Sequence, residues 1–137
     1  MTREQIMTVV GEVYAARVRG DVNAIVDAFT PDAKFTLNAA PPQACVAIDT
    51  KGCDGMRAAL NELVDAFEFQ QLDIVDSVVE GSRAAIRIRF TVRSRATGKT
   101  AVTESLDLLE FRDGKLASYT QFFDTATADR LTSVANA

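Results

Sequence analysis

The second half of the sequence has the pattern of strands joined by tight turns. Four stretches rich in β-branched and aromatic residues follow one another, at 69–80, 84–95, 100–111 and 115–124. Three dipeptides typical of hairpin turns separate them: Gly81-Ser82, Thr97-Gly98 and Asp113-Gly114. Strands this close in the chain pair as antiparallel neighbours, so the sequence predicts a four-stranded antiparallel meander.

Helical periodicity precedes this meander. Apolar residues recur at spacings of three and four in residues 3–18, again in 22–29, and again after Asp54. Asp21, Asp54 and Thr125 are suited to cap the second helix, the third helix and a short C-terminal helix. The sequence therefore predicts three helices before the meander and one after it.

Between the second and third helices, residues 33–38 alternate as a short strand. Residues 38–52 have no clear period, which indicates a loop or a short edge segment. Helices followed by an antiparallel sheet define an α+β fold with the helices packed on one sheet face. Because a strongly twisted sheet curls, such helices leave a cone-shaped cavity suited to a small molecule. The length of 137 residues fits a single domain, 1–137.

Composition excludes several classes of function. The net charge of -4 does not attract polyanions, so we expect no nucleic-acid partner. No apolar stretch has the length of a signal peptide or a membrane span, which favours the cytoplasm and no membrane partner. Without histidine, Ser-His-Asp and Cys-His nucleophiles and histidine-bound zinc are excluded. Cys45 and Cys53 are too few for a structural zinc site and are expected as free thiols, a disulfide between them being the alternative. We expect no metal or cofactor, and any acid–base chemistry must come from Asp, Glu, Tyr, Lys or Cys.

Strand 84–95 indicates which sheet face is buried. Its even-numbered positions from 86 to 92 are apolar and must face the core, whereas its odd-numbered positions carry four arginines. A row of arginines can contact nucleic acid. We instead expect it on the solvated face, paired with Glu68, Glu104 and Glu110 of the neighbouring strands.

Asp107, at the centre of the third strand of the meander, faces inward or outward according to the turn before it. A two-residue turn at Thr97-Gly98, or a four-residue loop, would place Asp107 opposite the apolar side of the preceding strand. A three-residue loop with a glycine bulge would pair it with Arg87 on the outside and turn Leu106 and Leu108 inward. Periodicity alone leaves both registers open.

The last strand has the same ambiguity. A three-residue loop with a bulge at 112–114 would place the odd-numbered residues 119–123 on the face of Asp107, whereas a two-residue turn would place the even-numbered residues 118–122 there. An inward Asp107 would be a buried acid with a pKa raised by desolvation, able to donate a hydrogen bond to a ligand. The alternative is a structural acid bonded to Tyr14, Gln121 or an arginine.

The order of elements follows that of a known superfamily in four stretches: YAARVRGDVNAIVDAF (14–29), GCDGMRAAL (52–60), LDLLEFRDGKL (106–116) and YTQFFDTA (119–126). The chain resembles the nuclear transport factor 2-like superfamily of cystatin-like fold, which includes ketosteroid isomerase, SnoaL-like polyketide cyclases and limonene epoxide hydrolase. The resemblance covers nearly the whole chain. It implies a cone-shaped, curved antiparallel sheet covered by the N-terminal helices, and a homodimer formed through the outer sheet face.

Ketosteroid isomerase is the most informative comparison. That family uses a tyrosine of the first helix and an aspartic acid of a late strand as donors to an oxyanion, and a second aspartate at the end of the first strand as base. Tyr14 and Asp107 match the two donors, and the distance of Asp107 from the preceding glycine turn favours the inward register. The base is missing, because the matching stretch is Thr36-Leu37-Asn38, which cannot abstract a proton near neutral pH.

Two hypotheses follow. In the first, the protein is a cofactor-free isomerase, cyclase or hydrolase that acts on a small apolar carbonyl compound, with Tyr14 and Asp107 polarising the carbonyl oxygen. In the second, it is a non-catalytic module for small-molecule binding or dimerisation. In either case an apolar, ring-containing ligand would contact the following residues: Phe35, Leu37, Met56, Phe90, Leu109, Tyr119, Gln121 and Phe123.

Overall fold

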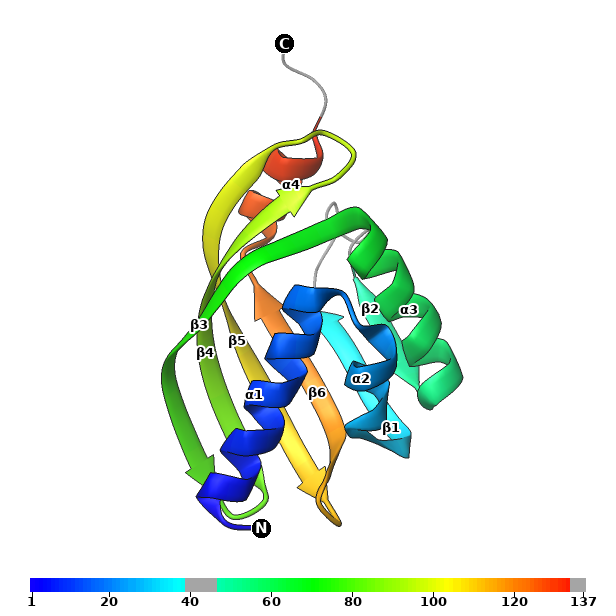
Figure 1. Cartoon of the computed structure of the whole chain (residues 1–137), viewed down its shortest axis with the longest axis vertical. Coiled ribbons are helices and arrows are strands. Elements are labelled where there is room, and N and C mark those ends of the chain that lie inside the picture. Colours follow the sequence, from blue (N-terminus) through cyan, green and yellow to red (C-terminus); the bar gives the residue numbers. More distant parts are fainter. Residues whose placement is uncertain (39–46, 134–137) are drawn as a thin grey trace.

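The structure, a computed structural model, describes residues 1–38 and 47–133. Its helices are α1 (Arg3–Arg19), α2 (Val22–Asp27), α3 (Cys53–Ala66) and α4 (Thr125–Thr132). Its strands are β1 (Phe29–Asn38), β2 (Ile48–Lys51), β3 (Phe67–Glu80), β4 (Arg83–Ser94), β5 (Thr100–Arg112) and β6 (Lys115–Phe123). The first three helices cover one face of a curved six-stranded sheet, and α4 lies at the far end of the β4–β5 hairpin (Figure 1). The predicted α+β class is confirmed.

The sheet has the strand order β2-β1-β6-β5-β4-β3 and is mixed rather than antiparallel. The meander from β3 to β6 is antiparallel as predicted. The expectation of a wholly antiparallel sheet is wrong, because β1 pairs with β6 in parallel. Two strands that lie far apart in the chain have no hairpin between them to fix their direction, so sequence proximity could not show this pairing.

The boundaries of the helices follow local chemistry. Gly20 ends α1 in the left-handed conformation with φ 74°, and the Asp21 carboxylate accepts from the Ala24 N–H as the cap of α2. Two predicted caps are wrong. α3 begins after Gly52 with no side-chain cap, and α4 is capped by Asp124, one residue before Thr125.

The first strand is longer than predicted and begins at Phe29. Its pairing with β6 is interrupted between Phe29 and Lys34, which is where Pro31 lies. A proline lacks an N–H, so it fits a strand at such an irregular section. Within the stretch predicted as a loop or an edge segment, residues 48–51 form the edge strand β2; residues 39–46, including Cys45, lie outside the described part of the chain.

The loop between β4 and β5 decides the direction of Asp107. The Ser94 N–H donates to the Lys99 carbonyl at 2.9 Å, which closes a four-residue loop. Asp107 consequently pairs with Ile86 and faces the helices. The inward register is confirmed, and the pairing with Arg87 is wrong.

The odd-numbered residues of β6 lie on the Asp107 face, but the β5–β6 connection is not the three-residue loop that would have placed them there. Asp113 and Gly114 form a two-residue turn with φ of 53° and 83°. This turn alone would have put the even-numbered residues of β6 on the Asp107 face. A register shift between Glu110 and Phe111 reverses the parity, so Gln121 lies opposite Asp107.

The outer sheet face carries the predicted ion pairs. Glu104 accepts from Arg87 at 2.8 Å and from Arg89 at 2.7 Å. Glu68 and Glu110 lie opposite further arginines at 3.9 Å and 3.6 Å. Exposed apolar residues lie among these pairs: Val78, Val102, Leu106, Leu108 and Phe122. Within residues 1–38 and 47–133, no helix is long and apolar enough to cross a membrane.

Candidate functional site

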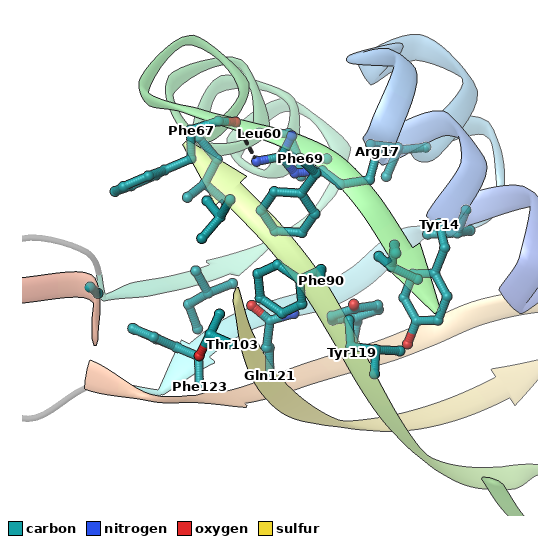
Figure 2. Close-up of a pocket in the computed structure, with 18 of the residues that line it drawn as sticks. Tyr14, Arg17, Leu60, Phe67, Phe69, Phe90, Thr103, Tyr119, Gln121 and Phe123 are labelled. Atoms are coloured by element: carbon teal, nitrogen blue, oxygen red, sulfur yellow. Dashed lines mark hydrogen bonds between the residues drawn. The ribbon is translucent and has the colours of Figure 1, made fainter. Parts of the chain in front are cut away.

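A cavity of about 110 Å³ lies between the sheet and its covering helices, with a mainly apolar wall (Figure 2). Six of the residues expected to contact a ligand line it: Phe35, Leu37, Phe90, Tyr119, Gln121 and Phe123. Met56 and Leu109 do not line it; they lie in the core with exposures of 0% and 2%. Whether a ligand contacts the six lining residues stays a prediction.

A buried cluster of one carboxyl group and three hydroxyl groups adjoins this cavity. Asp107 has no exposed surface, and the Tyr14 hydroxyl donates to its Oδ2 atom at 2.7 Å. The Tyr119 hydroxyl donates to the same oxygen. The Ser105 hydroxyl lies 3.4 Å from the other oxygen, Oδ1. Helix α1 and strands β5 and β6 thus supply the three main groups; Tyr14 lies 93 residues from Asp107 in the chain, and Tyr119 lies 12 residues from it.

Burial raises the pKa values of Tyr14, Asp107 and Tyr119 and so favours their protonated forms. Desolvation raises the pKa of Asp107, and the hydrogen bonds from Tyr119 and Tyr14 offset part of that rise. Desolvation and then the Asp107 charge raise the pKa values of both tyrosines. A protonated Asp107 can donate to one tyrosine oxygen, and that tyrosine can then donate its own proton to an acceptor in the cavity.

The tyrosines, not the acid, face the cavity. Tyr14 and Tyr119 belong to its wall, whereas Asp107 lies behind them. The resemblance implied two parallel donors, Tyr14 and Asp107; the structure instead bonds these residues to each other. It also adds Tyr119, which the sequence indicated only as a lining residue. Asp107 therefore holds two phenols through hydrogen bonds, and the catalytic role expected for Tyr14 and Asp107 stays a prediction.

The position expected for a base is apolar. Leu37 lines the cavity opposite Gln121, the neighbouring residue on β6. Among the described residues, Asp124 is the carboxylate that lines the cavity. Its oxygens accept from the Thr127 N–H at 3.1 Å and the Thr127 hydroxyl at 2.9 Å, and these bonds lower its pKa. A carboxylate committed to a helix cap in this way is a weak base.

Sequence reasoning missed a cation in the wall. Arg17 donates from Nη2 to the Phe67 carbonyl at 2.8 Å, and its guanidinium carbon lies 3.9 Å from the centroid of the Phe69 ring. Phe69 in turn stacks on Phe90 at 4.4 Å (Figure 2). Desolvation lowers the pKa of Arg17 to about 10, so it stays charged at neutral pH. Its spacing of three residues from Tyr14, on the same helix face, is the signal that could have found it.

Residues 10–119 match a family model described as a SnoaL-like domain. The chain belongs to the SnoaL-like domain family. This finding agrees with the resemblance to the nuclear transport factor 2-like superfamily. Among curated proteins, none matches the sequence significantly.

Solved structures share the fold of this SnoaL-like protein. An NTF2-like protein of unknown function from Burkholderia pseudomallei is 23% identical, with 97% of this chain and 100% of that chain covered and a TM-score of 0.82. A proposed isomerase from Bacillus subtilis is 12% identical, with coverages of 93% and 92% and a TM-score of 0.84. A proposed polyketide cyclase from Xanthomonas campestris is 19% identical, with coverages of 96% and 98% and a TM-score of 0.77. At these identities the likeness shows the fold alone.

Proposed function

We propose that this SnoaL-like protein is a cofactor-free enzyme of the isomerase or cyclase type that acts on a small apolar carbonyl compound. The observation that carries the proposal is the pair of tyrosines, Tyr14 and Tyr119, held by one oxygen of a buried acid at the wall of an apolar cavity. The names of the two solved structures described as a proposed isomerase and a proposed polyketide cyclase are compatible with it.

The tyrosines would act on the substrate oxygen. A carbonyl oxygen in the cavity would accept a hydrogen bond from Tyr14 or Tyr119, and a protonated Asp107 would then donate a hydrogen bond to the oxygen of that phenol. The bond to the substrate would strengthen as the oxygen gains negative charge during enolisation, because the cavity wall is mainly apolar and the folded chain already holds both phenols beside it. Asp107 acts through the tyrosines and is a positioning residue.

The missing base restricts the reaction class. Leu37 cannot take a proton, and the cap bonds occupy Asp124. The site therefore suits a substrate whose carbon is already acidified, such as one between two carbonyl groups; its α-proton would pass to water or to a base in solution, while the tyrosines stabilise the oxyanion. Keto–enol isomerisation and intramolecular carbon–carbon cyclisation are reactions of this kind.

The second candidate is a non-catalytic binding module of the same fold. The apolar Leu37 at the base position favours it. The two candidates share the cavity and differ in whether a bound carbonyl compound exchanges its α-protons.

Two measurements test the proposal. 4-Nitrophenol, whose anion mimics an enolate, should bind to the wild type, and pH titration of its absorbance should show that Tyr119→Phe disfavours the bound anion by about 10- to 100-fold. Deuterium exchange at the α-carbons of acetylacetone, followed by NMR, should be faster with the wild type than with Tyr119→Phe. A Glu110→Gln variant on the outer face is the matched control. Binding without any enzyme-dependent exchange would reject the enzyme and favour the binding module.

We also propose that two copies pair through the outer sheet face. Leu106, Leu108 and Phe122 are each 41% exposed there, and Leu106 lies directly between Arg87 and Phe122 in the sheet. Burying these side chains against a second copy would remove them from water, while the surrounding ion pairs form a polar rim.

A further inference from the structure

The cavity wall contains a cation, Arg17, that forms no ion pair within the described residues, although the Asp124 carboxylate also lines the cavity. Arg17 is half-buried and forms no ion pair there, whereas the arginines of the outer sheet face have acidic partners. A guanidinium group has five N–H donors, and one of those of Arg17, on Nη2, has an acceptor in the described residues, the Phe67 carbonyl. The group lies against the Phe69 ring, and the neighbouring wall is formed by Leu60 and Leu63.

Such a placement is unfavourable unless something compensates for the lost hydration. Burial lowers the pKa of Arg17, the Tyr119 phenol offsets part of this, and the positive charge of Arg95 lowers it further. Capping the end of α3 explains one donor only. Arg95 already donates from Nε to the Val64 carbonyl at that helix end, at 3.2 Å. The Phe69 ring offsets part of the cost of the charge, and the remaining N–H donors of Arg17 have no acceptor among the described residues.

We propose that Arg17 binds the carboxylate of the ligand, so that the cavity takes small cyclic or aromatic carboxylic acids that carry a second oxygen remote from the carboxylate. This proposal deepens the proposed function and rests on it for the place of that second oxygen, at Tyr14 and Tyr119. A planar guanidinium suits a carboxylate because it can donate two parallel hydrogen bonds.

The positions of the groups set the shape of this ligand. Tyr14 and Arg17 lie on one face of α1, about 4.5 Å apart along the helix axis, since each residue rises 1.5 Å. Both line the same cavity, with Phe69 and Phe90 also in its wall (Figure 2). A six-membered ring with oxygen groups at opposite ends would place one oxygen at the tyrosines, its ring against Phe69 and Phe90, and its carboxylate at Arg17.

The test compares an acid with its neutral isostere. 4-Hydroxybenzoate and 4-hydroxybenzamide would be titrated into the wild type and into Arg17→Met, which keeps an unbranched side chain without the charge. We expect the wild type to bind the acid about 10- to 100-fold more tightly than the amide. In Arg17→Met this preference should disappear, while affinity for the amide changes by less than about threefold. A wild type without the preference, or without saturable binding of either compound, overturns the proposal.

The melting temperature of Arg17→Met and one further variant, Tyr119→Phe, separate the possible failures. If Arg17 only closes the end of α3, Arg17→Met lowers the melting temperature and leaves the acid-to-amide ratio unchanged, which also overturns the proposal. Tyr119→Phe should weaken both compounds and keep their ratio. If Tyr119→Phe has no effect while Arg17→Met removes the preference, the proposed function fails and the carboxylate site stands. If Tyr119→Phe weakens binding of both compounds and Arg17→Met leaves the acid-to-amide ratio unchanged, the carboxylate site is rejected and the proposed function stands.

Discussion

Replacing Asp107 by leucine tests the buried cluster most directly. Leucine has the same number and branching of heavy side-chain atoms as aspartate, but it removes the acceptor of two buried hydroxyls, those of Tyr14 and Tyr119, which are 5% and 7% exposed. Each buried hydroxyl left without an acceptor costs about 1–3 kcal/mol, so two give about 2–6 kcal/mol. Both hydroxyls contact the same carboxylate oxygen, so without it they can turn toward each other, which lowers the expected cost to about 2–4 kcal/mol. For a domain of this size that is a large share of a total of about 5–15 kcal/mol.

The measurement is urea unfolding of Asp107→Leu, of the double variant Tyr14→Phe with Tyr119→Phe, and of the triple variant. Replacing both partners of a buried hydrogen bond by apolar groups is nearly neutral, so the triple variant should recover most of the stability that Asp107→Leu loses. Asp107→Asn, which keeps an acceptor oxygen, should lose less. The reasoning is refuted if Asp107→Leu unfolds within about 1 kcal/mol of the wild type, or if the triple variant is no more stable than Asp107→Leu.

Three other predictions follow from single features. Folding raises the pKa of Asp107, so the folded chain keeps a proton that the unfolded chain releases. The stability of the wild type relative to Asp107→Asn should therefore fall as the pH rises from about 4 through the raised pKa. Melting temperatures of both proteins would show this, and a difference that stays constant or rises with pH would contradict the prediction. Asp124→Ala removes the cap of α4 and should cost about 1 kcal/mol, with faster amide exchange in 125–132; exchange at the wild-type rate would speak against the cap. Leu108→Lys on the outer sheet face should shift sedimentation from dimer to monomer, and a wild type that sediments only as monomer at micromolar concentration rejects the dimer.

Local patterns determined the elements and much of the site composition. Strand 84–95 has apolar residues at every second position because a strand buries one face, so the inward Phe90 and the outward ion pairs of Arg87 and Arg89 could be predicted. Asp21 was predicted as a cap because the interaction spans only three residues. The cap of α4 was misplaced by one residue, since Asp124 and Thr125 are both good capping residues.

The register of the strands and the contacts between elements depend on the tertiary structure. A shift of one residue turns a whole strand over, so the loop closed by Ser94 and Lys99 and the register shift after Glu110 determined that Asp107 and Tyr119 meet. The parallel partner of β1 and the cationic wall at Arg17 likewise depend on residues far away in the chain. The periodicity of the elements and the Asp21 cap could be predicted from local residues, because both act within a few positions of the chain. Burial, the shifted pKa values and the tyrosine pair on Asp107 depend on contacts across 12 and 93 residues, which only the folded chain makes.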